Sequence, residues 1–321
     1  MNQARRRTRL ALTLLIVAAL CLAMTFFRFS ASWSHALLNH VVVLDITQSM
    51  NTLDYSLAGK PVSRLQYAKS ALRLALSALP CGSKIGWAVF TEYRSYLLLA
   101  PVEVCANFGD LARTLAQMDN RMAWAGASEI AKGLNSGLRT VKSLPDRPAL
   151  VFITDGHEAP PIDPRHRVDM DVKPGEIRGL IVGVGGLVPL PIPKFDPDGN
   201  PLGFWRSDEV LHTDVYSQGR ATSTPGERLV ELTQPQSNAP KRDGREHLSA
   251  LHEAYLQQLA AEAGMSYQRL QAEQDLVSAL QTSALAYRGT ARTELQWIPA
   301  LLALVALLAP YLNWRASALR A

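Results

Sequence analysis

The sequence predicts an α/β fold with a doubly wound, mainly parallel sheet, one antiparallel edge strand and two flanking transmembrane helices. Aliphatic runs typical of buried strands alternate with segments of helical spacing, which favours a parallel sheet covered on both faces. Two expected strands are joined by a short polar link, which indicates a hairpin. Uncharged apolar runs near both chain ends are long enough to cross a bilayer.

The expected elements follow from apolar periodicity and from the residues at their ends. Strands are expected at 41–45, 83–90, 95–102, 148–156, 177–186 and 265–270. Helices are expected at 61–79, 108–118, 128–144 and 247–264, the first begun by Pro61 and the last closed by Gly264. A further helix is expected from about Asp275, continuing into the second apolar run.

Residues 187–246 interrupt this alternation and are rich in Pro, Gly and polar residues, so they are expected to form a loop-like insertion with a small hairpin around "DPDGN". Asp196, Asp198 and Asn200 have the spacing that begins a calcium loop. No glutamate follows at the required position, so a turn is expected there.

The net charge of +5 first suggests nucleic-acid binding, but the positive charge lies at the chain ends. Seven arginines lie there: Arg5, Arg6, Arg7, Arg9, Arg28, Arg315 and Arg320. Without them the chain has 26 basic and 28 acidic residues, a net charge of −2. The basic ends are instead typical of residues that hold membrane spans in orientation.

We therefore expect spans at 10–28 and 295–314, with cytoplasmic tails 1–9 and 315–321. The positive-inside rule places both ends in the cytoplasm and the intervening residues outside it, in the periplasm of a bacterial inner membrane. The first run has an alternative reading as a cleaved signal peptide, because "FSAS" at 29–32 offers small residues for cleavage. The side of the membrane is the same in both readings.

Two of the three cysteines lie in the expected extracytoplasmic part, where disulfides are stable. If the turn of this hairpin is centred near residues 92–93, the numbers of two residues that face each other across it add up to about 185. The residue numbers of Cys81 and Cys105 add up to 186, so we expect these cysteines to face each other and form a disulfide. Two unrelated free thiols are the alternative.

Oxygen-bearing side chains follow three of the expected elements. Asp45, Thr47 and Ser49 alternate where the first strand ends, in "VVVLDITQSM". Ser128 lies at the start of the third helix, and Asp155 lies at the end of a buried strand. Ligands from the carboxyl ends of parallel strands meet at one edge of a sheet. Carboxylates and hydroxyls are hard donors suited to Mg²⁺, Ca²⁺ or Mn²⁺.

The set DxTxS, a hydroxyl in a Gly-then-helix loop and a strand ending in TDG resembles the metal-ion-dependent adhesion site of von Willebrand factor type A (VWA) domains. The usual first element is DxSxS and the second usually has Thr where this chain has Ser128, and both departures keep a hydroxyl. The resemblance implies a Rossmann-like VWA domain at about 38–275, excluding the insertion. With the flanking spans, the chain resembles the membrane-anchored bacterial subgroup linked to MoxR-type ATPases, which includes Bat-type and methanol-oxidation accessory proteins.

The resemblance implies that Asp45, Thr47, Ser49, Ser128 and Asp155 hold a divalent cation, most simply Mg²⁺, directly or through water. A protein partner would supply a carboxylate to the metal, and a sister VWA protein and a MoxR-type ATPase system are further implied partners. The chain is then expected to be a membrane-anchored accessory or assembly factor that docks a partner and catalyses nothing.

Two alternatives remain open at the level of sequence. Asp45 and Ser128 could cap the segments that follow them, and Asp155 could lie in a turn. A metal-dependent phosphohydrolase with Asp45 as nucleophile would need a second carboxylate where Thr47 stands, and a lysine near the metal. His157, Glu158, Asp163 and His166 follow without ligand spacing and are expected to form a polar loop near the rim of the site.

Overall fold

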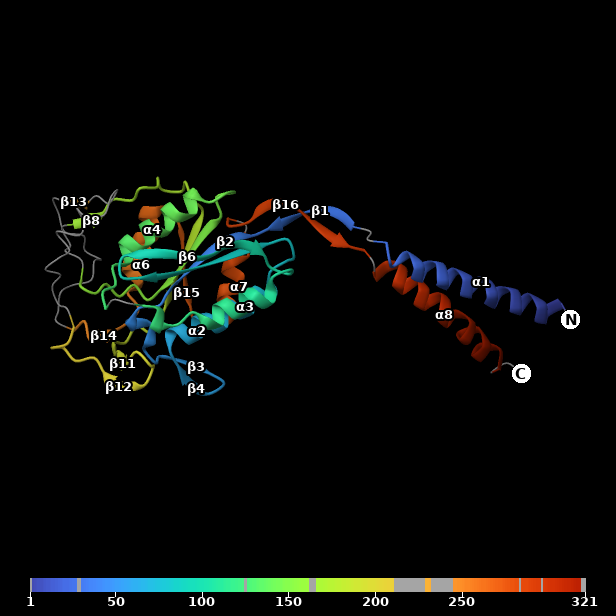
Figure 1. Ribbon diagram of the computed structural model, residues 1–321, viewed down its shortest axis with the longest axis horizontal. Helices are drawn as coiled ribbons and strands as arrows, with labels where there is room; N and C mark the ends of the chain where they lie inside the picture. Colours follow the sequence, from blue (N-terminus) through green and yellow to red (C-terminus); the bar gives the residue numbers. More distant parts are fainter. Residues whose placement is uncertain are drawn as a thin grey trace. The chain divides into compact units, whose positions relative to one another are not determined.

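The computed structural model describes residues 2–27, 30–123, 126–161, 166–210, 229–231, 245–282, 284–295 and 297–318. The chain divides into two compact units, which Figure 1 shows as ribbons. The larger unit comprises residues 36–287 and contains the central sheet. The smaller unit comprises residues 1–35 and 288–321 from the two ends of the chain.

The central sheet has six strands in the order β15-β9-β7-β2-β5-β6, and only β6 runs antiparallel to its neighbour. The bounds are β2 Asn39–Asp45, β5 Lys84–Thr91, β6 Arg94–Glu103, β7 Ala149–Thr154, β9 Gly179–Val184 and β15 Ser266–Leu270. The predicted mainly parallel sheet with one antiparallel edge strand is therefore confirmed.

Helices cover both faces of the sheet, which explains why every residue of β2, β7 and β9 is buried. Val42 and Leu44 of β2 pack in a core with α2 (Arg64–Ala78), α3 (Phe108–Gln117) and α7 (Glu273–Leu280). Val41 and Val43 point the other way, into a core with α4 (Ile130–Ser143) and α6 (Glu253–Ala263).

Helix α2 begins three residues later than Pro61 predicts. The Ser63 hydroxyl accepts a hydrogen bond from the Gln66 backbone, and the Gln66 side chain accepts one from the Ser63 backbone. This capping box fixes the first turn of the helix. Pro61 instead lies in β4 (Lys60–Val62), which pairs with β3 (Tyr55–Leu57).

Strands β5 and β6 form the predicted hairpin. Near the turn, the numbers of paired residues add up to 185, as for Thr91 with Arg94. Two bulges shift the pairing, so that the sum is 187 for Lys84 with Glu103. Cys81 and Cys105 form a disulfide beyond the open end, with 5.3 Å between their Cα atoms. This cross-link ties the start of β5 to the residues that lead into α3.

The insertion contains short strand pairs in its described residues. Strand β11 (Pro193–Phe195) pairs with β12 (Pro201–Phe204), which confirms the hairpin around "DPDGN". The Asp196 carboxylate accepts hydrogen bonds from the Asn200 backbone and side-chain amide, as expected of a turn. The other pairs are β10 (Leu190–Pro191) with β14 (Leu248–Ser249), and β8 (His166–Val168) with β13 (Leu229–Glu231).

Two predicted helices are wrong in part. The helix expected at 247–264 begins only at Glu253, because Leu248 and Ser249 pair with β10. It does end at Gly264, whose φ of 66° is the left-handed conformation that favours glycine. The helix expected from Asp275 does not continue to the chain end. Helix α7 stops at Leu280, and β16 (Tyr287–Glu294) follows.

The unit of the chain ends contains α1 (Asn2–Met24), most of β1 (Ser30–Leu37), most of β16 and α8 (Trp297–Ala318). Strand β1 pairs with β16, and the two helices lie side by side (Figure 1). Within the described residues, no helix reaches the length and apolar character needed to cross a membrane. The spans predicted at 10–28 and 295–314 are therefore not supported.

Candidate metal centre

Two buried carboxylates meet at the carboxyl edge of the central sheet. Asp45 is the last residue of β2, and Asp155 directly follows β7, the neighbouring parallel strand. Neither side chain is exposed to solvent. Because neighbouring parallel strands end at the same edge, this placement follows from topology, as the sequence predicted.

The alternating residues after β2 fold into a turn around the Asp45 carboxylate. Its Oδ1 accepts hydrogen bonds from the Thr47 backbone N–H at 2.9 Å and from the Thr47 hydroxyl at 2.7 Å. The Thr154 hydroxyl donates to Oδ2 at 2.6 Å. This turn leads into a 3₁₀ turn, η1 (Gln48–Asn51), and aims the next hydroxyl towards the neighbouring strand.

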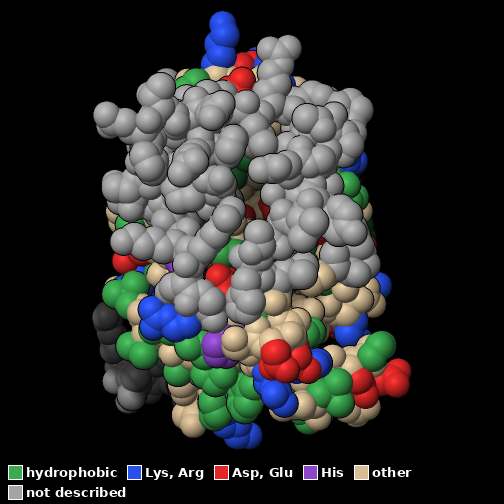
Figure 2. Space-filling model, turned by 90° about the vertical axis from the view of Figure 1, so that its left-hand side faces the viewer, with side chains coloured by type: hydrophobic (Ala, Val, Ile, Leu, Met, Phe, Trp, Pro, Cys, Tyr) green, Lys and Arg blue, Asp and Glu red, His purple; other side chains and the backbone are tan. Residues whose placement is uncertain are grey.

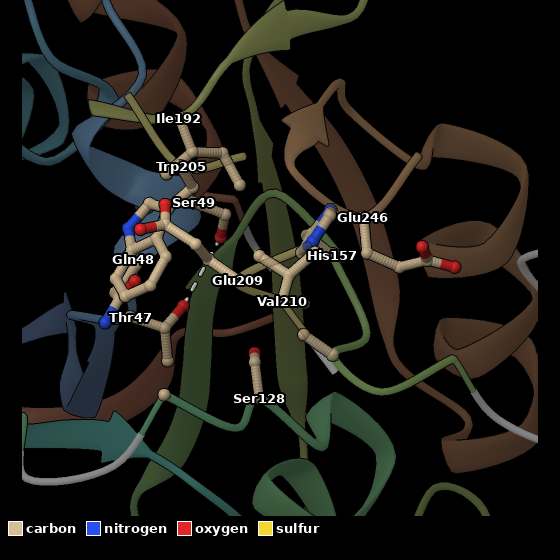
Figure 3. A pocket seen from close by; sticks show the side chains of 12 residues that line it. Thr47, Gln48, Ser49, Ser128, His157, Ile192, Trp205, Glu209, Val210 and Glu246 are labelled. Atoms are coloured by element: carbon tan, nitrogen blue, oxygen red, sulfur yellow. Dashed lines mark hydrogen bonds between the residues drawn. The ribbon is translucent and has the colours of Figure 1, made fainter. Parts of the chain in front are cut away.

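Hydrogen bonds connect four of the five predicted ligands. The Thr47 and Ser49 hydroxyl oxygens are 3.3 Å apart, drawn as a dashed line in Figure 3. The Ser49 hydroxyl donates to Asp155 Oδ1 at 3.1 Å. Asp45, Thr47, Ser49 and Asp155 thus form one cluster of oxygens.

Ser128 provides the fifth oxygen, opposite this cluster. Its backbone N–H donates to the Ala159 carbonyl at 2.7 Å, which holds the loop before α4 against the segment that follows Asp155. The Ser128 hydroxyl is buried and has no hydrogen-bond partner among the described residues. It points into a pocket that Thr47 and Ser49 also line (Figure 3).

The capping alternative fails for Ser128. The residue that caps α4 is Glu129, and its side chain makes no capping hydrogen bond. A buried hydroxyl without a partner is costly, by about 1–3 kcal/mol, so its presence beside two carboxylates needs an explanation. Asp45, in contrast, does stabilise the turn that follows it, as the alternative proposed.

Arg64 is a site residue that the sequence analysis missed. Its fully buried guanidinium donates to Asp155 Oδ2 at 2.6 Å, to Asp54 Oδ2 at 2.8 Å and to the Ser249 carbonyl at 3.1 Å. The available signal was its spacing of four from Ala68, which places an arginine in the apolar stripe of α2. Thr154 and Ser249, which also contact the two carboxylates, lack any comparable signal.

The two carboxylates have opposite pKa shifts. Burial and the negative charge of Asp155 raise the pKa of Asp45 to about 7. Burial also acts to raise the pKa of Asp155, but the Arg64 guanidinium and hydrogen bonds from His157 and Ser49 outweigh it and lower that pKa. The site therefore holds one firmly charged carboxylate beside another whose charge burial opposes.

These residues fit a divalent cation. The Arg64 guanidinium contacts the carboxylates of Asp54 and Asp155, and the Asp45 carboxylate is close enough to Asp155 for its pKa to be raised, so the cluster has an excess of negative charge when all three are ionised. All the predicted donors are hard oxygens, and the Ser128 hydroxyl lacks a protein partner. A cation held by Asp45, Thr47, Ser49, Ser128 and Asp155 would favour the charged form of Asp45, which burial alone disfavours.

The residues after Asp155 do not form the expected polar loop at the rim. His157 and Glu158 are both buried. The Glu158 carboxylate accepts hydrogen bonds from the backbone N–H groups of Ile130 and Ala131, at the start of α4. Asp163 lies outside the described residues, as does the side chain of His166.

A second metal site is not evident in the described parts of the chain. Only Cys81, Glu103 and Cys105 form a cluster of three His, Cys, Asp or Glu side chains close enough to share an ion. The two cysteine sulfurs are bonded to each other and are therefore not available as thiolate ligands.

Comparison with known proteins agrees with this geometry. Residues 40–157 match the family model described as the von Willebrand factor type A domain. All five predicted ligands lie within that stretch, so the match supports a VWA domain there. No curated protein matches the chain.

Solved structures resemble the chain more distantly. An aerotolerance-related membrane protein from Bacteroides fragilis is 18% identical, with 77% of this chain and 98% of that chain covered and a TM-score of 0.48. A von Willebrand factor type A protein from Catenulispora acidiphila is 10% identical, with coverages of 78% and 42% and a TM-score of 0.39. The manganese-loaded TRAP protein of Plasmodium vivax is 9% identical, with coverages of 83% and 81% and a TM-score of 0.33.

Proposed function

We propose that this protein binds a divalent cation at the carboxyl edge of its sheet and docks a protein partner through that cation. Asp45, Thr47, Ser49, Ser128 and Asp155 hold the ion, directly or through water, and a carboxylate of the partner completes its coordination. The observation that carries the proposal is the buried Ser128 hydroxyl, which has no partner in the described structure and faces a hydrogen-bonded cluster of the other four ligands.

Coordination chemistry explains why such a site would bind rather than catalyse. Mg²⁺ prefers six oxygen ligands and keeps several waters, so a carboxylate from outside is a favourable replacement for one of them. The alternative phosphohydrolase needs Asp45 as an exposed nucleophile. Asp45 is instead fully buried, and both of its oxygens accept hydrogen bonds, from Thr47 and Thr154.

We further propose that the chain is anchored in the bacterial inner membrane and serves as an accessory or assembly factor, in association with a sister VWA protein and a MoxR-type ATPase system. The support for anchoring is the apolar composition of both end segments and the arginines that flank them. The accessory role rests on resemblance alone and is independent of the metal site.

Calorimetric titration of the purified full-length chain with Mg²⁺, Mn²⁺ and Ca²⁺ tests the metal site. Saturable binding to the wild type is expected, with loss of binding in Asp45→Ala and in Asp155→Ala. A matched control is Asp196→Ala, because Asp196 lies in an exposed turn of the insertion. Absence of binding to a folded wild-type chain, or equal binding by all four proteins, would refute the proposal.

A further inference from the structure

One oxygen of the Asp155 carboxylate is already occupied by protein donors. A carboxylate oxygen offers about two lone-pair positions to hydrogen-bond donors or metals. Asp155 Oδ2 accepts from the Arg64 guanidinium at 2.6 Å and from the Ser249 hydroxyl at 3.2 Å, which together fill both positions. Asp155 Oδ1 is the oxygen that contacts another proposed ligand, the Ser49 hydroxyl, at 3.1 Å. Asp155 therefore has only Oδ1 with which to approach a cation.

Asp45 is restricted in a similar way by the residues around it. Its Oδ1 accepts hydrogen bonds from both the backbone N–H and the hydroxyl of Thr47. Its Oδ2 accepts one from the Thr154 hydroxyl, which in turn accepts a hydrogen bond from the Gly156 N–H at 3.0 Å. One position remains on Oδ2. Neither aspartate is thus arranged to hold a cation through both of its oxygens.

The guanidinium that occupies Asp155 Oδ2 is held in place by further contacts. Its Nε and Nη2 atoms lie 2.8 and 2.7 Å from Asp54 Oδ2, and Nη2 donates to the Ser249 carbonyl at 3.1 Å. The main chain also closes around it, because a Cβ atom at Gly185 would lie 2.9 Å from Arg64 Nε. Arg64 is fully buried and cannot leave Asp155 without breaking these contacts.

The other carboxylates that line the pocket do not supply the missing oxygens. Glu209 accepts hydrogen bonds from the Lys194 ammonium at 2.7 Å and from the Arg206 backbone N–H at 3.1 Å, one on each oxygen. Figure 3 shows the Glu246 carboxylate pointing away from the side of the pocket where the proposed ligands lie. In the described parts of the chain, no third acidic side chain is close enough to the two aspartates to share an ion with both.

We propose that Arg64 is a positioning residue that sets the metal preference of the centre, because it leaves Asp155 one free oxygen and thereby favours Mg²⁺ over Ca²⁺. Mg²⁺ demands near-ideal octahedral geometry and keeps several waters, whereas Ca²⁺ accepts a larger, more flexible shell in which carboxylates often bind through both oxygens. Ligands that each offer one oxygen match the smaller ion. This inference rests on the proposed function and names the specificity of the same site.

The ratio of the Ca²⁺ and Mg²⁺ affinities distinguishes a coordination effect from a charge effect. The two ions have the same charge, so loss of the guanidinium charge alone should change both affinities by a similar factor and leave their ratio unchanged. A second free oxygen on Asp155 helps only the ion that can use it, which is Ca²⁺. A purely structural role of Arg64 in the fold would not move this ratio.

Calorimetric titration of the full-length chain with each ion measures the ratio. Arg64→Met combined with Asp54→Asn removes the guanidinium together with one of its two carboxylates, so the net charge of the cluster is kept and fewer buried charges lose their partner. We expect the Ca²⁺ affinity to rise relative to the Mg²⁺ affinity by at least about tenfold, which corresponds to about 1.4 kcal/mol. Asp54→Asn alone is the matched control. It keeps Arg64 on Asp155 and should leave the ratio as in the wild type.

A milder variant covers the case in which the double variant does not fold. Ser249→Ala opens one position on Asp155 Oδ2 and keeps Arg64 in place, so it should move the ratio in the same direction by a smaller factor. Thermal unfolding shows which variants are folded. If the double variant is not, an unchanged ratio in Ser249→Ala overturns the inference.

The outcomes also separate this inference from the proposed function. Failure of the folded wild type to bind either ion would refute both. Wild-type affinity for Ca²⁺ equal to or above that for Mg²⁺, or an unchanged ratio in a folded double variant, would overturn the role of Arg64 and leave the cation site intact. An equal shift in the Asp54→Asn control would assign the effect to Asp54 and would overturn that role as well.

Discussion

Four of the five proposed metal ligands have side-chain hydrogen-bond partners within the described structure, and one does not. The hydroxyls of Thr47, Ser49 and Thr154 all hydrogen-bond to carboxylates, whereas the Ser128 hydroxyl has no partner in the described structure. This difference predicts that the Ser128 hydroxyl contributes to the binding of a cation and does not stabilise the metal-free protein.

Ser128→Ala is therefore expected to lower divalent-metal affinity without destabilising the fold. The loss should be at least about tenfold, since even outer-shell partners of a metal contribute 10–100-fold. In EDTA, its free energy of unfolding should not fall below that of the wild type and should rise by up to about 1–3 kcal/mol, because no protein hydrogen bond is lost and a buried hydroxyl without a partner is removed. Calorimetry and urea unfolding measure the two quantities on the same preparations.

Ser249→Ala provides the contrast for that experiment. Ser249 is fully buried, accepts a hydrogen bond from Arg64 at 2.7 Å and donates to Asp155 at 3.2 Å. Its removal should lower the free energy of unfolding by about 1–3 kcal/mol even without metal. A comparable loss of stability in Ser128→Ala would show that Ser128 is a structural residue and would weaken its assignment as a ligand.

Site residues that lie close together in the sequence could be predicted, whereas those far from the others along the chain could not. Asp45, Thr47 and Ser49 could be read together because their alternation lies within five residues at a strand end. Arg64 and Ser249 contact Asp155 from 91 and 94 residues away, so their roles depend on how α2 and β14 pack against the sheet. Neighbouring sequence contains too little information to place such contacts.

Secondary-structure elements were predicted correctly where the apolar pattern of the sequence determines them, and less well where strand pairing determines them. The strands of the sheet are continuous apolar runs and were recognised as such. The segment 247–252 has helical composition, but Leu248 and Ser249 pair with β10 instead of extending α6. Tertiary pairing here overrides helical propensity, which is a weak determinant of structure.

One buried carboxylate links two helices on the same face of the sheet. Glu158 accepts hydrogen bonds from the Ile130 and Ala131 backbone at the start of α4, and from the Tyr255 hydroxyl of α6 at 2.5 Å. It thereby holds the beginning of α4, just after Ser128, against the rest of the unit. Burial, the largest effect, raises the pKa of Glu158 to about 8.

The raised pKa of Glu158 predicts a pH-dependent stability. The folded state binds this proton more tightly than the unfolded state, whose pKa is 4.5. The resulting stabilisation is fully present below pH 4.5 and is lost as the pH rises through about 8. Glu158→Gln lacks this proton equilibrium, so the wild type should lose stability relative to the variant between pH 5 and pH 8.

Urea unfolding of both proteins in EDTA at these two pH values measures the effect. The comparison removes the contributions of other groups, such as Asp45, that titrate in both proteins. A difference in unfolding free energy that stays constant with pH would mean that Glu158 is charged in the folded state throughout, and that the three hydrogen bonds outweigh its burial.

At the scale of the whole molecule, the metal centre belongs entirely to one unit. All five proposed ligands, together with Arg64, His157 and Ser249, lie within residues 36–287. The end segments contribute no residue to the site, and they contain all seven of the arginines that make the full chain basic. The division into units therefore coincides with a division between proposed docking and proposed anchoring.

This division predicts that the two properties can be separated experimentally. The fragment 36–287 should bind Mg²⁺ or Mn²⁺ with the affinity of the full chain, because it retains every ligand and both apolar cores. Expressed in bacteria, the full chain should remain with the membrane pellet after carbonate extraction, whereas the fragment should stay in the soluble fraction. Release of the full chain by carbonate would contradict anchoring, and a folded fragment without metal binding would show that the end segments complete the site.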